Sequence, residues 1–536
     1  MKSTRFEKYL WIVIWILAGI FALWPIGEVL LQSILEDGVF SLIGWKKLFT
    51  SQLSILTNSL KVASLVTIIT VPLASCIALF LARSRSRWRM LVGAMLILSL
   101  LSPPFVGSMA FIMLFGRRGL ITWNLLGLNW DPYGMTGIVL MEAFALTTLA
   151  TMLLTVTLKG IDRSLENASL DLGMSKSRTL LYVTLPLCLP GIAATSLLVF
   201  VRSLSDFSTP LIVGGQFQVL ASKAYMALIH MGDFQLSSAM SSLLLIPAII
   251  AVWGMRKLGS GPTFSMRMAD RQPGFALPGG VAAVAGSAAL FFTLAQLLLY
   301  GLILWGSVSV TWGVNFSFTL DHLHALLDFR QSSILRSLGC ALTAACGGSL
   351  LGMVCAGLLR HTAPLRRQWA ESLLTLPYIL PGTFFGLGYL LAFSRLPFDI
   401  SASALIAFNC MFRQLAPSLK AGTAGVSSID PALEKAVRDL GGGPSAYFKD
   451  VLIPLLRPSA LFAFVNAFSA SMISTGPIIF LVTPYAKVMS VDMFESINSG
   501  SFGEANAMAV ALIGLVLTME GIVFLIDRLW RRHARV

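Results

Sequence analysis

SLENASLDLG, residues 164–173, has a second copy in this chain, ALEKAVRDLG, which occupies residues 432–441. The two copies are 268 residues apart, and each is followed at the same interval by an aliphatic residue and a proline, Pro186 or Pro454. Within each copy the apolar and small residues recur at i, i+3, i+4 and i+7, which is the spacing of one face of a helix. Each copy therefore predicts an amphipathic helix at a fixed distance before an apolar segment.

Capping residues bound both of these predicted helices. Asp162 and Asp430 stand where a side chain can cap the first turn, and Pro431 takes the first helical position of the second copy. Gly173 and Gly441 stand where a left-handed turn would end the helix. A second short amphipathic stretch follows each glycine, so both loops predict a helix, a glycine turn and another helix.

The composition predicts an all-α polytopic membrane protein. Of the 536 residues, 56% are hydrophobic and 12% are charged, whereas a soluble domain carries roughly 25% charged residues. Because a membrane-spanning helix needs about 20 apolar residues, we expect about 12 transmembrane helices. The formal net charge of +14 does not indicate a nucleic-acid partner, since the basic residues flank apolar segments in the manner of the positive-inside rule.

The basic residues also orient the chain in the bilayer. The first apolar run, from Tyr9 to about Leu31, is longer than a signal-peptide core and lacks a small-residue cleavage site, so we expect a retained first span. Lysines and arginines before this run and after the last one predict that the N- and C-termini are both cytoplasmic.

The repeat divides the chain into two membrane domains. We expect the first at residues 1–255, a Gly- and Pro-rich cytoplasmic linker at 256–280, and the second at 281–536. About six spans in each domain return the chain to its starting side, so the two repeats are parallel and related by an axis along the membrane normal. The loops at 159–186 and 420–454 then both face the cytoplasm.

Motifs for catalysis do not occur in the sequence. It contains no Gly-x4-Gly-Lys-Ser/Thr phosphate loop, no nucleophile–base pattern and no His/Cys/Asp metal cluster, so we expect no enzyme activity, no metal site and no cofactor. His322 and His324 are interpreted as a solvated pair rather than as metal ligands. The six cysteines nearly all lie in apolar segments, none as Cys-x2-Cys, and are interpreted as small buried hydrophobes.

The two loops resemble the signature loop of importer-type ABC transporter permeases. The family pattern, Glu-x-Ala-x4-Gly and then an aliphatic residue and proline, matches at Glu166, Ala168, Gly173 and Pro186 and again at Glu434, Ala436, Gly441 and Pro454. The family's first alanine is replaced by Asn167 and Lys435. The resemblance implies the type I ABC importer permease fold and loops that couple to a dimer of cytoplasmic ATP-binding subunits. A carboxylate in the first turn of a helix is also mildly stabilising without any such role.

Two further stretches and the fusion of two halves in one chain resemble the ferric-iron permease family of these importers. The stretches are SPPFVGSMAFIMLFGRRGL and DFSTPLIVGG. The resemblance implies a bacterial inner-membrane permease that receives ferric iron from a periplasmic substrate-binding protein and has no strong site of its own. Importers of thiamine, 2-aminoethylphosphonate and polyamines share much of the pattern, and Arg202 and Arg413 do not suit a simple cation path, so these cargoes stay open.

Charged residues inside the predicted spans are candidates for the passage. A charge at the bilayer centre costs roughly 2.5–3.5 kcal/mol on insertion scales, so it needs a partner or water. Arg202 and Asp206 lie four residues apart, where they either pair with each other or line the outer mouth, and Arg413 is equally open. Glu142 is the mid-span carboxylate that the alternative class, an ion-coupled secondary transporter, would use. Asp492, in an outer segment, is either solvated or a contact for the binding protein.

Overall fold

A computed structural model gives the structure of the chain. It describes residues 5–36, 38–117, 119–127, 131–257, 275–360, 362–397, 399–443 and 446–533, and at a few helical positions, Glu434 among them, it describes the backbone alone.

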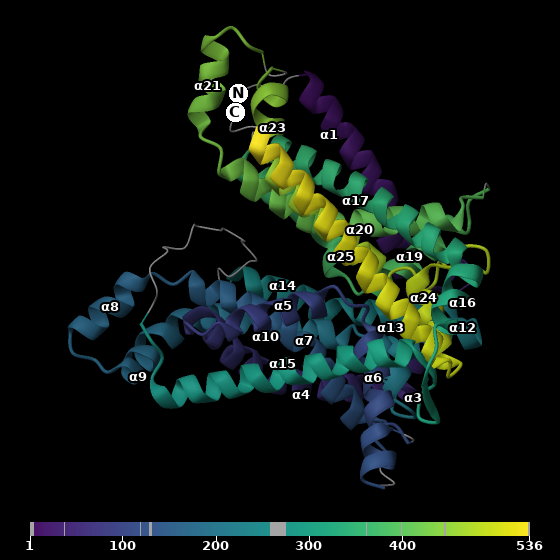
Figure 1. Cartoon of the computed structure of the whole chain (residues 1–536). Helices are drawn as coiled ribbons and strands as arrows, with labels where there is room; N and C mark the ends of the chain where they lie inside the picture. Colours follow the sequence, from purple (N-terminus) through teal and green to yellow (C-terminus); the bar gives the residue numbers. More distant parts are fainter. Residues whose placement is uncertain are drawn as a thin grey trace. The chain divides into compact units, whose positions relative to one another are not determined.

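Helices make up nearly all of the structure, and η1 to η4 are short π-helical segments (Figure 1). The elements of the first half are α1 (Arg5–Ala18), η1 (Gly19–Leu23), α2 (Trp24–Ile34), β1 (Leu35–Glu36), β2 (Val39–Phe40), α3 (Ile43–Ser51), α4 (Leu53–Arg83), α5 (Trp88–Leu100), α6 (Phe105–Phe115), η2 (Leu120–Leu125), α7 (Met135–Lys159), α8 (Arg163–Asp171), α9 (Lys176–Thr179), η3 (Leu180–Thr184), α10 (Leu185–Leu204), α11 (Ser208–Val213), α12 (Leu220–Met231), α13 (Phe234–Leu243) and α14 (Leu245–Lys257).

The second half repeats most of this order of elements, and each half carries one small two-stranded antiparallel sheet. Its elements are α15 (Gly279–Ser307), β3 (Ser309–Thr311), β4 (Asn315–Phe318), α16 (Asp321–Phe329), α17 (Gln331–Arg360), α18 (Pro364–Ile379), α19 (Gly382–Phe393), α20 (Ala402–Ser427), α21 (Pro431–Asp439), η4 (Tyr447–Leu452), α23 (Ile453–Met472), α24 (Met489–Asn498) and α25 (Phe502–His533).

The bounds of the elements follow the repeat found in the sequence. The two ends of α21 lie 268 residues after those of α8, and both ends of α23 are displaced from those of α10 by the same number. The secondary structure is therefore duplicated together with the sequence.

Ten helical segments of the described residues are long and apolar enough to cross a membrane, and the pair α18–α19, bent by 97°, makes an eleventh. α20 is 26 residues long but less apolar than these, because it carries the buried polar residues Asn409, Arg413 and Gln414. With α20 included, the described helices provide six spans in each half of the sequence. The predicted all-α polytopic fold is confirmed.

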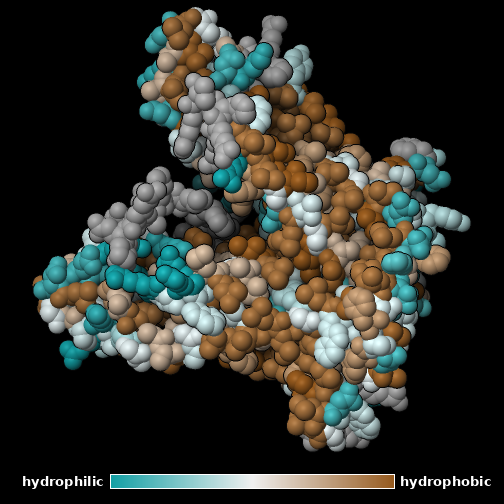
Figure 2. All heavy atoms as spheres, viewed as in Figure 1, coloured by the Kyte–Doolittle hydropathy of each residue, from teal (hydrophilic) through white to brown (hydrophobic). Residues whose placement is uncertain are grey.

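Apolar side chains face outward along the spans, as brown surfaces on the helices show (Figure 2). Ile68, Ile249 and Phe291 are each more than half exposed. A protein surrounded by water seldom exposes apolar patches of this extent. These surfaces are expected to contact lipid tails, because the hydrocarbon core of a bilayer is an apolar environment that accommodates apolar side chains.

The helices pack into two compact units. One comprises Met1–Phe40, Leu327–Asp492 and Ala511–Val536, and the other comprises Ser41–Leu326 and Met493–Val510. This division follows packing, whereas the predicted domains 1–255 and 281–536 follow the sequence repeat. The two divisions differ, and the domain boundaries stay a prediction.

The N-terminal span packs with helices of the second half, within the first of these units. The Phe21 ring stacks on Phe408 and Phe412, with centroid distances of 4.6 and 5.4 Å, and its carbonyl oxygen accepts a hydrogen bond from Tyr389 Oη at 2.7 Å. Gly388 is needed for this contact, because a β-carbon there would lie 2.4 Å from the main-chain oxygen of Pro25. Aromatic packing and the close approach together fix α2 on α19.

In the other unit, α4, α7 and α10 pack together, and a cluster of buried residues joins them to α5 and α15. Phe144 of α7 and Phe292 of α15 lie 4.8 Å apart between ring centroids, and Ile77 and Leu96 are buried in the same cluster. α8 and α9 lie beyond the ends of these long helices (Figure 1). The first predicted loop therefore projects from a packed helical body.

Candidate functional site

The first loop has the predicted structure of helix, glycine turn and helix. The carboxylate of Asp162 accepts a hydrogen bond from the Ser164 N–H at 2.9 Å and so caps α8. This bond, assisted by the Ser164 hydroxyl, lowers the pKa of Asp162 from its ordinary value. Gly173 ends the helix with φ of +86°, a left-handed conformation that favours glycine, and the Met174 N–H then bonds to the Ser169 carbonyl at 3.1 Å.

The short helices after the turn are tied back to α8. Ser175 caps α9, and the hydroxyl groups of Ser169 and Thr179 lie 3.0 Å apart, joining the two helices side to side. The π-helical turn η3 leads directly into α10, which has Pro186 in its first turn. The loop is therefore continuous with a long span, so a displacement of α8 reaches α10 through a short connection.

Glu166 is buried inside this chain rather than exposed on the loop. Its Oε1 accepts a hydrogen bond from Nη2 of Arg83 at 2.6 Å, and the exposed fractions of the two side chains are 1% and 2%. The hydroxyl of Thr184 donates to the same oxygen at 2.7 Å. Leaving one member of such a buried pair alone is strongly unfavourable, about 3–5 kcal/mol. The pair therefore fastens α8 to the last residue of α4.

The linker between the two halves contributes to the same contact. The guanidinium carbon of Arg83 lies 5.5 Å from the centroid of the buried Phe275 ring, within range of a cation–π interaction. We call Arg83, Glu166, Thr184 and Phe275 the Arg83 cluster. It joins the end of α4, α8, the last residue of η3 just before α10, and the described end of the predicted linker.

Other residues of the first loop point outward. Leu172, immediately before the glycine turn, is 86% exposed, and Ala168 is exposed as well. The apolar face predicted from spacing is thus divided, because Ser169 is buried against α9 while Leu172 is left uncovered. A single exposed leucine is not by itself evidence of a partner, so the position of Leu172 has meaning only together with that of its counterpart in the second loop.

The second loop has the same backbone plan. Asp430 caps the first turn of α21, since its Oδ1 accepts from the Ala432 N–H at 2.8 Å, and Gly441 ends the helix with φ of +81°. Leu440, the counterpart of Leu172, is 88% exposed. The side chain of Glu434 lies outside the described residues, and α21 carries Ala436 on its exposed side.

An arginine at the end of a span also holds the second loop. Arg360, the last residue of α17, donates from Nη1 to the Tyr447 hydroxyl at 2.7 Å, and its guanidinium lies 5.9 Å from the centre of the same ring. Tyr447 is the first residue of η4, which leads into α23 and Pro454. In the sequence, Arg83 and Arg360 are two of the basic residues that flank apolar segments and so indicate only which ends of the spans face the cytoplasm. Their matched positions at the ends of α4 and α17 are the signal that could have assigned them to the loops.

The predicted passage residues have structural partners. Oδ1 of Asp206 accepts from both the N–H and the hydroxyl of Ser208, and Arg202 lies in the last turn of α10. Arg413 is buried in α20, and its Nη1 donates to the carbonyl oxygens of Pro377 at 3.0 Å and Leu380 at 3.2 Å. Those carbonyls stand at the break between α18 and α19. Arg413 thus satisfies backbone groups that the break leaves open, and a place for these three charges on the passage stays a prediction.

Two interpretations of the outer segments can be compared with the structure. Asp492 is buried, and its Oδ1 lies 3.3 Å from Nη1 of Arg330, so the expectation of a solvated carboxylate is wrong. The cause is that the start of α24 packs inside its unit. His322 bonds to the Ser309 carbonyl at 3.0 Å, and the described residues contain no group of three metal-ligating side chains. The six cysteines are free, and Cys346 is the one that is exposed.

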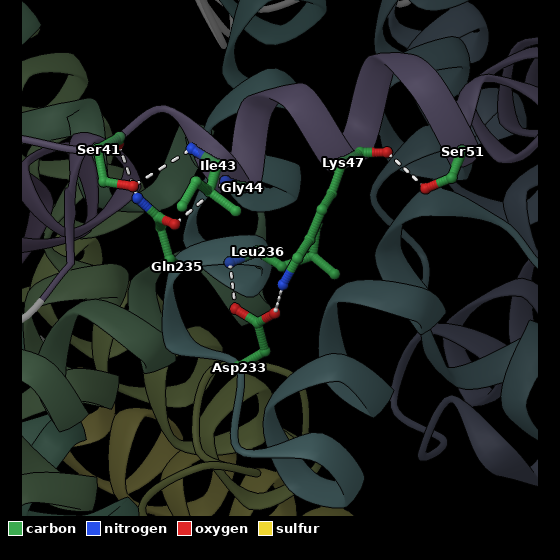
Figure 3. Close-up of polar contacts among 8 residues, drawn as sticks. All are labelled: Ser41, Ile43, Gly44, Lys47, Ser51, Asp233, Gln235 and Leu236. Atoms are coloured by element: carbon green, nitrogen blue, oxygen red, sulfur yellow. Dashed lines mark hydrogen bonds and ion pairs between the residues drawn. The ribbon is translucent and has the colours of Figure 1, made fainter.

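A polar contact that sequence reasoning missed fixes the helix α3 to the start of α13 (Figure 3). Lys47 forms an ion pair with Asp233 at 2.9 Å, while Gln235 accepts from the Gly44 N–H at 3.1 Å and donates to the Ser41 carbonyl at 2.7 Å. A β-carbon on Gly44 would lie 3.1 Å from the Gln235 side chain, so glycine permits the approach. The helix α3 is therefore held firmly on the surface of its unit.

Comparisons with known proteins agree with this architecture. Residues 74–303 match the family described as "Binding-protein-dependent transport system inner membrane component". The ferric transport system permease protein FbpB of Actinobacillus pleuropneumoniae is 29% identical over 494 residues, which cover 88% of this chain and 71% of the relative.

Two more relatives differ in how much of the chain they cover. A Haemophilus influenzae protein whose name assigns it to ferric transport, FbpB 1, is 30% identical over 82% of this chain and 71% of its own length. A Salmonella paratyphi A protein whose name assigns it to 2-aminoethylphosphonate transport, PhnV, is 26% identical over 45% of this chain and 93% of its own length.

Proposed function

The chain belongs to the inner-membrane permeases of binding-protein-dependent ABC importers, and from this we propose that it passes ferric iron from a periplasmic binding protein to the cytoplasm. The similarity to proteins named for ferric transport extends over more than four-fifths of the chain, whereas the relative named for 2-aminoethylphosphonate aligns with less than half of it. PhnV is a shorter protein that aligns over 93% of its own length, whereas the relatives named for ferric transport match across both halves of this chain, and this shared two-half architecture favours iron.

The observation that carries the coupling role is the pair of loops with one plan. Each has a capped helix, a left-handed glycine and an exposed leucine, Leu172 or Leu440. Two matched surfaces on one chain suit a partner that is itself two-fold, since such a partner offers the same patch twice. We therefore assign both loops to the docking of a dimer of separate ATP-binding subunits, with both termini on the same cytoplasmic side.

The Arg83 cluster gives this docking a mechanical consequence. A force applied at Leu172 acts on α8, and Glu166 transfers it to the end of α4 through a buried ion pair at 2.6 Å. Thr184 transfers part of it to the start of α10 at 2.7 Å. Because the contacts are buried and short, α4 and α10 move with the loop rather than after it. Closure of the ATPase dimer can thus reorient the spans that line a passage.

Within the motif, the roles of the residues separate. Glu166 holds the loop to its own chain, Gly173 and Gly441 set the turn, and the exposed Ala168 and Ala436 leave room for a partner to approach. Pro186 and Pro454 stand at the second residue of α10 and of α23, where each span follows directly on the π-helical turn of its loop.

The test is reconstitution with the cargo itself. The complex purified through a tag on this chain is placed in proteoliposomes with the binding protein, and uptake of radioactive ferric iron is measured with ATP and with a non-hydrolysable analogue. Uptake that requires ATP hydrolysis supports the proposal. Accumulation driven by an ion gradient without ATP, or selective uptake of 2-aminoethylphosphonate, contradicts it.

A further inference from the structure

A carboxylate with an unused oxygen is buried in the middle of one unit. Glu142 of α7 is 2% exposed, and its Oε2 accepts a hydrogen bond from the hydroxyl of Ser203. Its Oε1 is buried and has no hydrogen-bond partner among the residues that the structure describes. A charged group removed from water needs a counter-charge or a proton, because a single neutral hydrogen bond does not replace its hydration.

A second carboxylate lies close in the chain to the serine that bonds to Glu142. Asp206 follows Ser203 by three residues, and its N–H donates to the Ser203 carbonyl at 3.1 Å. Oδ1 of Asp206 accepts both hydrogen bonds of Ser208, from the N–H at 2.9 Å and from the hydroxyl. The end of α10 thus places the Ser203 hydroxyl on Glu142 and, three residues further along the chain, a second carboxylate with the Ser208 hydroxyl bonded to it.

The other repeat makes the same packing arrangement without any carboxylate. Residues 268 positions later are Cys410 in place of Glu142, Ser471 in place of Ser203 and Ser474 in place of Asp206. Cys410 is buried beside both serines. The fold of this region therefore does not require acidic side chains, and their presence in the first repeat needs another explanation.

Two carboxylates and two hydroxyls are the donor set that hard, highly charged cations prefer, since such cations bind oxygen ligands. We propose that Glu142, Ser203, Asp206 and Ser208 form a binding site for a hard trivalent metal cation in the first half of the chain. This inference rests on the proposed ferric cargo and deepens it, since the site is a stopping point for the cargo on one side of the passage. Because the second repeat has no carboxylates at the corresponding positions, we expect one such metal site per chain.

The experiment measures binding without transport. The full chain in lipid nanodiscs is titrated with Tb³⁺, a luminescent hard trivalent cation, and with ferric citrate as competitor. One equivalent of Tb³⁺ displaced by ferric iron supports the site. Glu142→Gln and Asp206→Asn should each weaken Tb³⁺ binding by at least about tenfold. Removing a group that only supports a metal ligand already lowers metal affinity by about 10- to 100-fold, and removing a ligand itself should cost no less.

A matched pair of variants separates binding from folding. Glu142→Cys with Asp206→Ser installs the residues of the second repeat, which already pack in this arrangement, so the variant should fold and lose Tb³⁺ binding. Ser474→Ala, the control in the other repeat, should bind Tb³⁺ like the parent chain.

Three outcomes overturn the inference: parental Tb³⁺ binding by a correctly folded Glu142→Gln variant, two equivalents per chain, or no binding by the parent chain. The last would mean that a proton neutralises Glu142. If binding is absent while ATP-driven iron uptake persists, the site is wrong and the proposed function stands. If the unmodified complex shows no ATP-driven uptake of iron, the proposed function is wrong whether or not the chain binds Tb³⁺.

Discussion

Removing one member of the Arg83–Glu166 pair should release the first loop from the end of α4. Glu166→Gln keeps the size of the side chain and a hydrogen bond to Thr184, but it leaves the guanidinium of Arg83 buried without its counter-charge. Breaking a buried pair in this way costs about 3–5 kcal/mol. Both side chains are nearly inaccessible to water, at 2% and 1% exposed, so little of this energy is lost to screening.

Amide hydrogen exchange of the loop at residues 159–186 reads this effect directly. Each 1.4 kcal/mol changes the equilibrium constant for opening of the loop by a factor of ten. A cost of about 3–5 kcal/mol should therefore lower the protection of the α8 amides by roughly 100- to 4,000-fold in Glu166→Gln. The apolar double variant Arg83→Met with Glu166→Leu should recover most of the protection, since hydrophobic replacement of a buried pair is often neutral. ATP-driven uptake should fall with Glu166→Gln and recover in part with the double variant.

The matched control is Arg367→Ala, which breaks the partly exposed pair of Arg367 with Glu371 at 2.8 Å in the basic turn of the second half. An exposed i, i+4 pair contributes about 0.3–0.5 kcal/mol, so exchange there should change by less than about threefold. Unchanged protection of α8 in Glu166→Gln, or an equal effect in the control, would refute the proposed fastening of the loop.

Three further changes test the loops and the bent span. Gly173→Pro should abolish uptake while the chain still inserts in the membrane, because proline cannot adopt a φ of +86°; uptake at the parental rate in membranes that contain the variant would contradict the role of the turn. Leu172→Asp and Leu440→Asp should each weaken association with the ATP-binding subunits in a pull-down of the purified complex, without lowering the melting temperature of the isolated chain, since both side chains are more than four-fifths exposed. Arg413→Met should destabilise the chain by about 1–3 kcal/mol for each main-chain oxygen that it leaves without a donor, measured by thermal unfolding in detergent; an unchanged melting temperature would show that water replaces the guanidinium.

Much of the fold could be predicted because the information is local and duplicated. Spans follow from runs of apolar residues, and the glycine turns follow from a residue type that alone adopts positive φ without strain. The constant spacing between the two loops indicates a repeat from the amino-acid sequence alone. Gly173 and Gly441 occupy left-handed turns as predicted.

Contacts between residues distant in the sequence could not be predicted in the same way. The partner of Glu166 lies 83 residues earlier in the chain, and periodicity assigns a side chain to a face without saying what covers that face. For that reason the spacing of the motif could not show that Glu166 is buried or that Leu172 is exposed. Asp492 shows the same limit, because a short helix in a loop can turn its carboxylate toward the interior of its unit.

The packing of the N-terminal span on the second half has a consequence for how the protein is made. The main-chain oxygen of Phe21 and the hydroxyl of Tyr389, which bond in the finished protein, are separated by 368 residues. At a ribosomal rate of about 5–20 residues per second, the first helix resides in the bilayer for roughly 20 to 75 seconds before its aromatic partners are synthesised. During biogenesis this helix thus waits without these partners until the second half of the chain is synthesised.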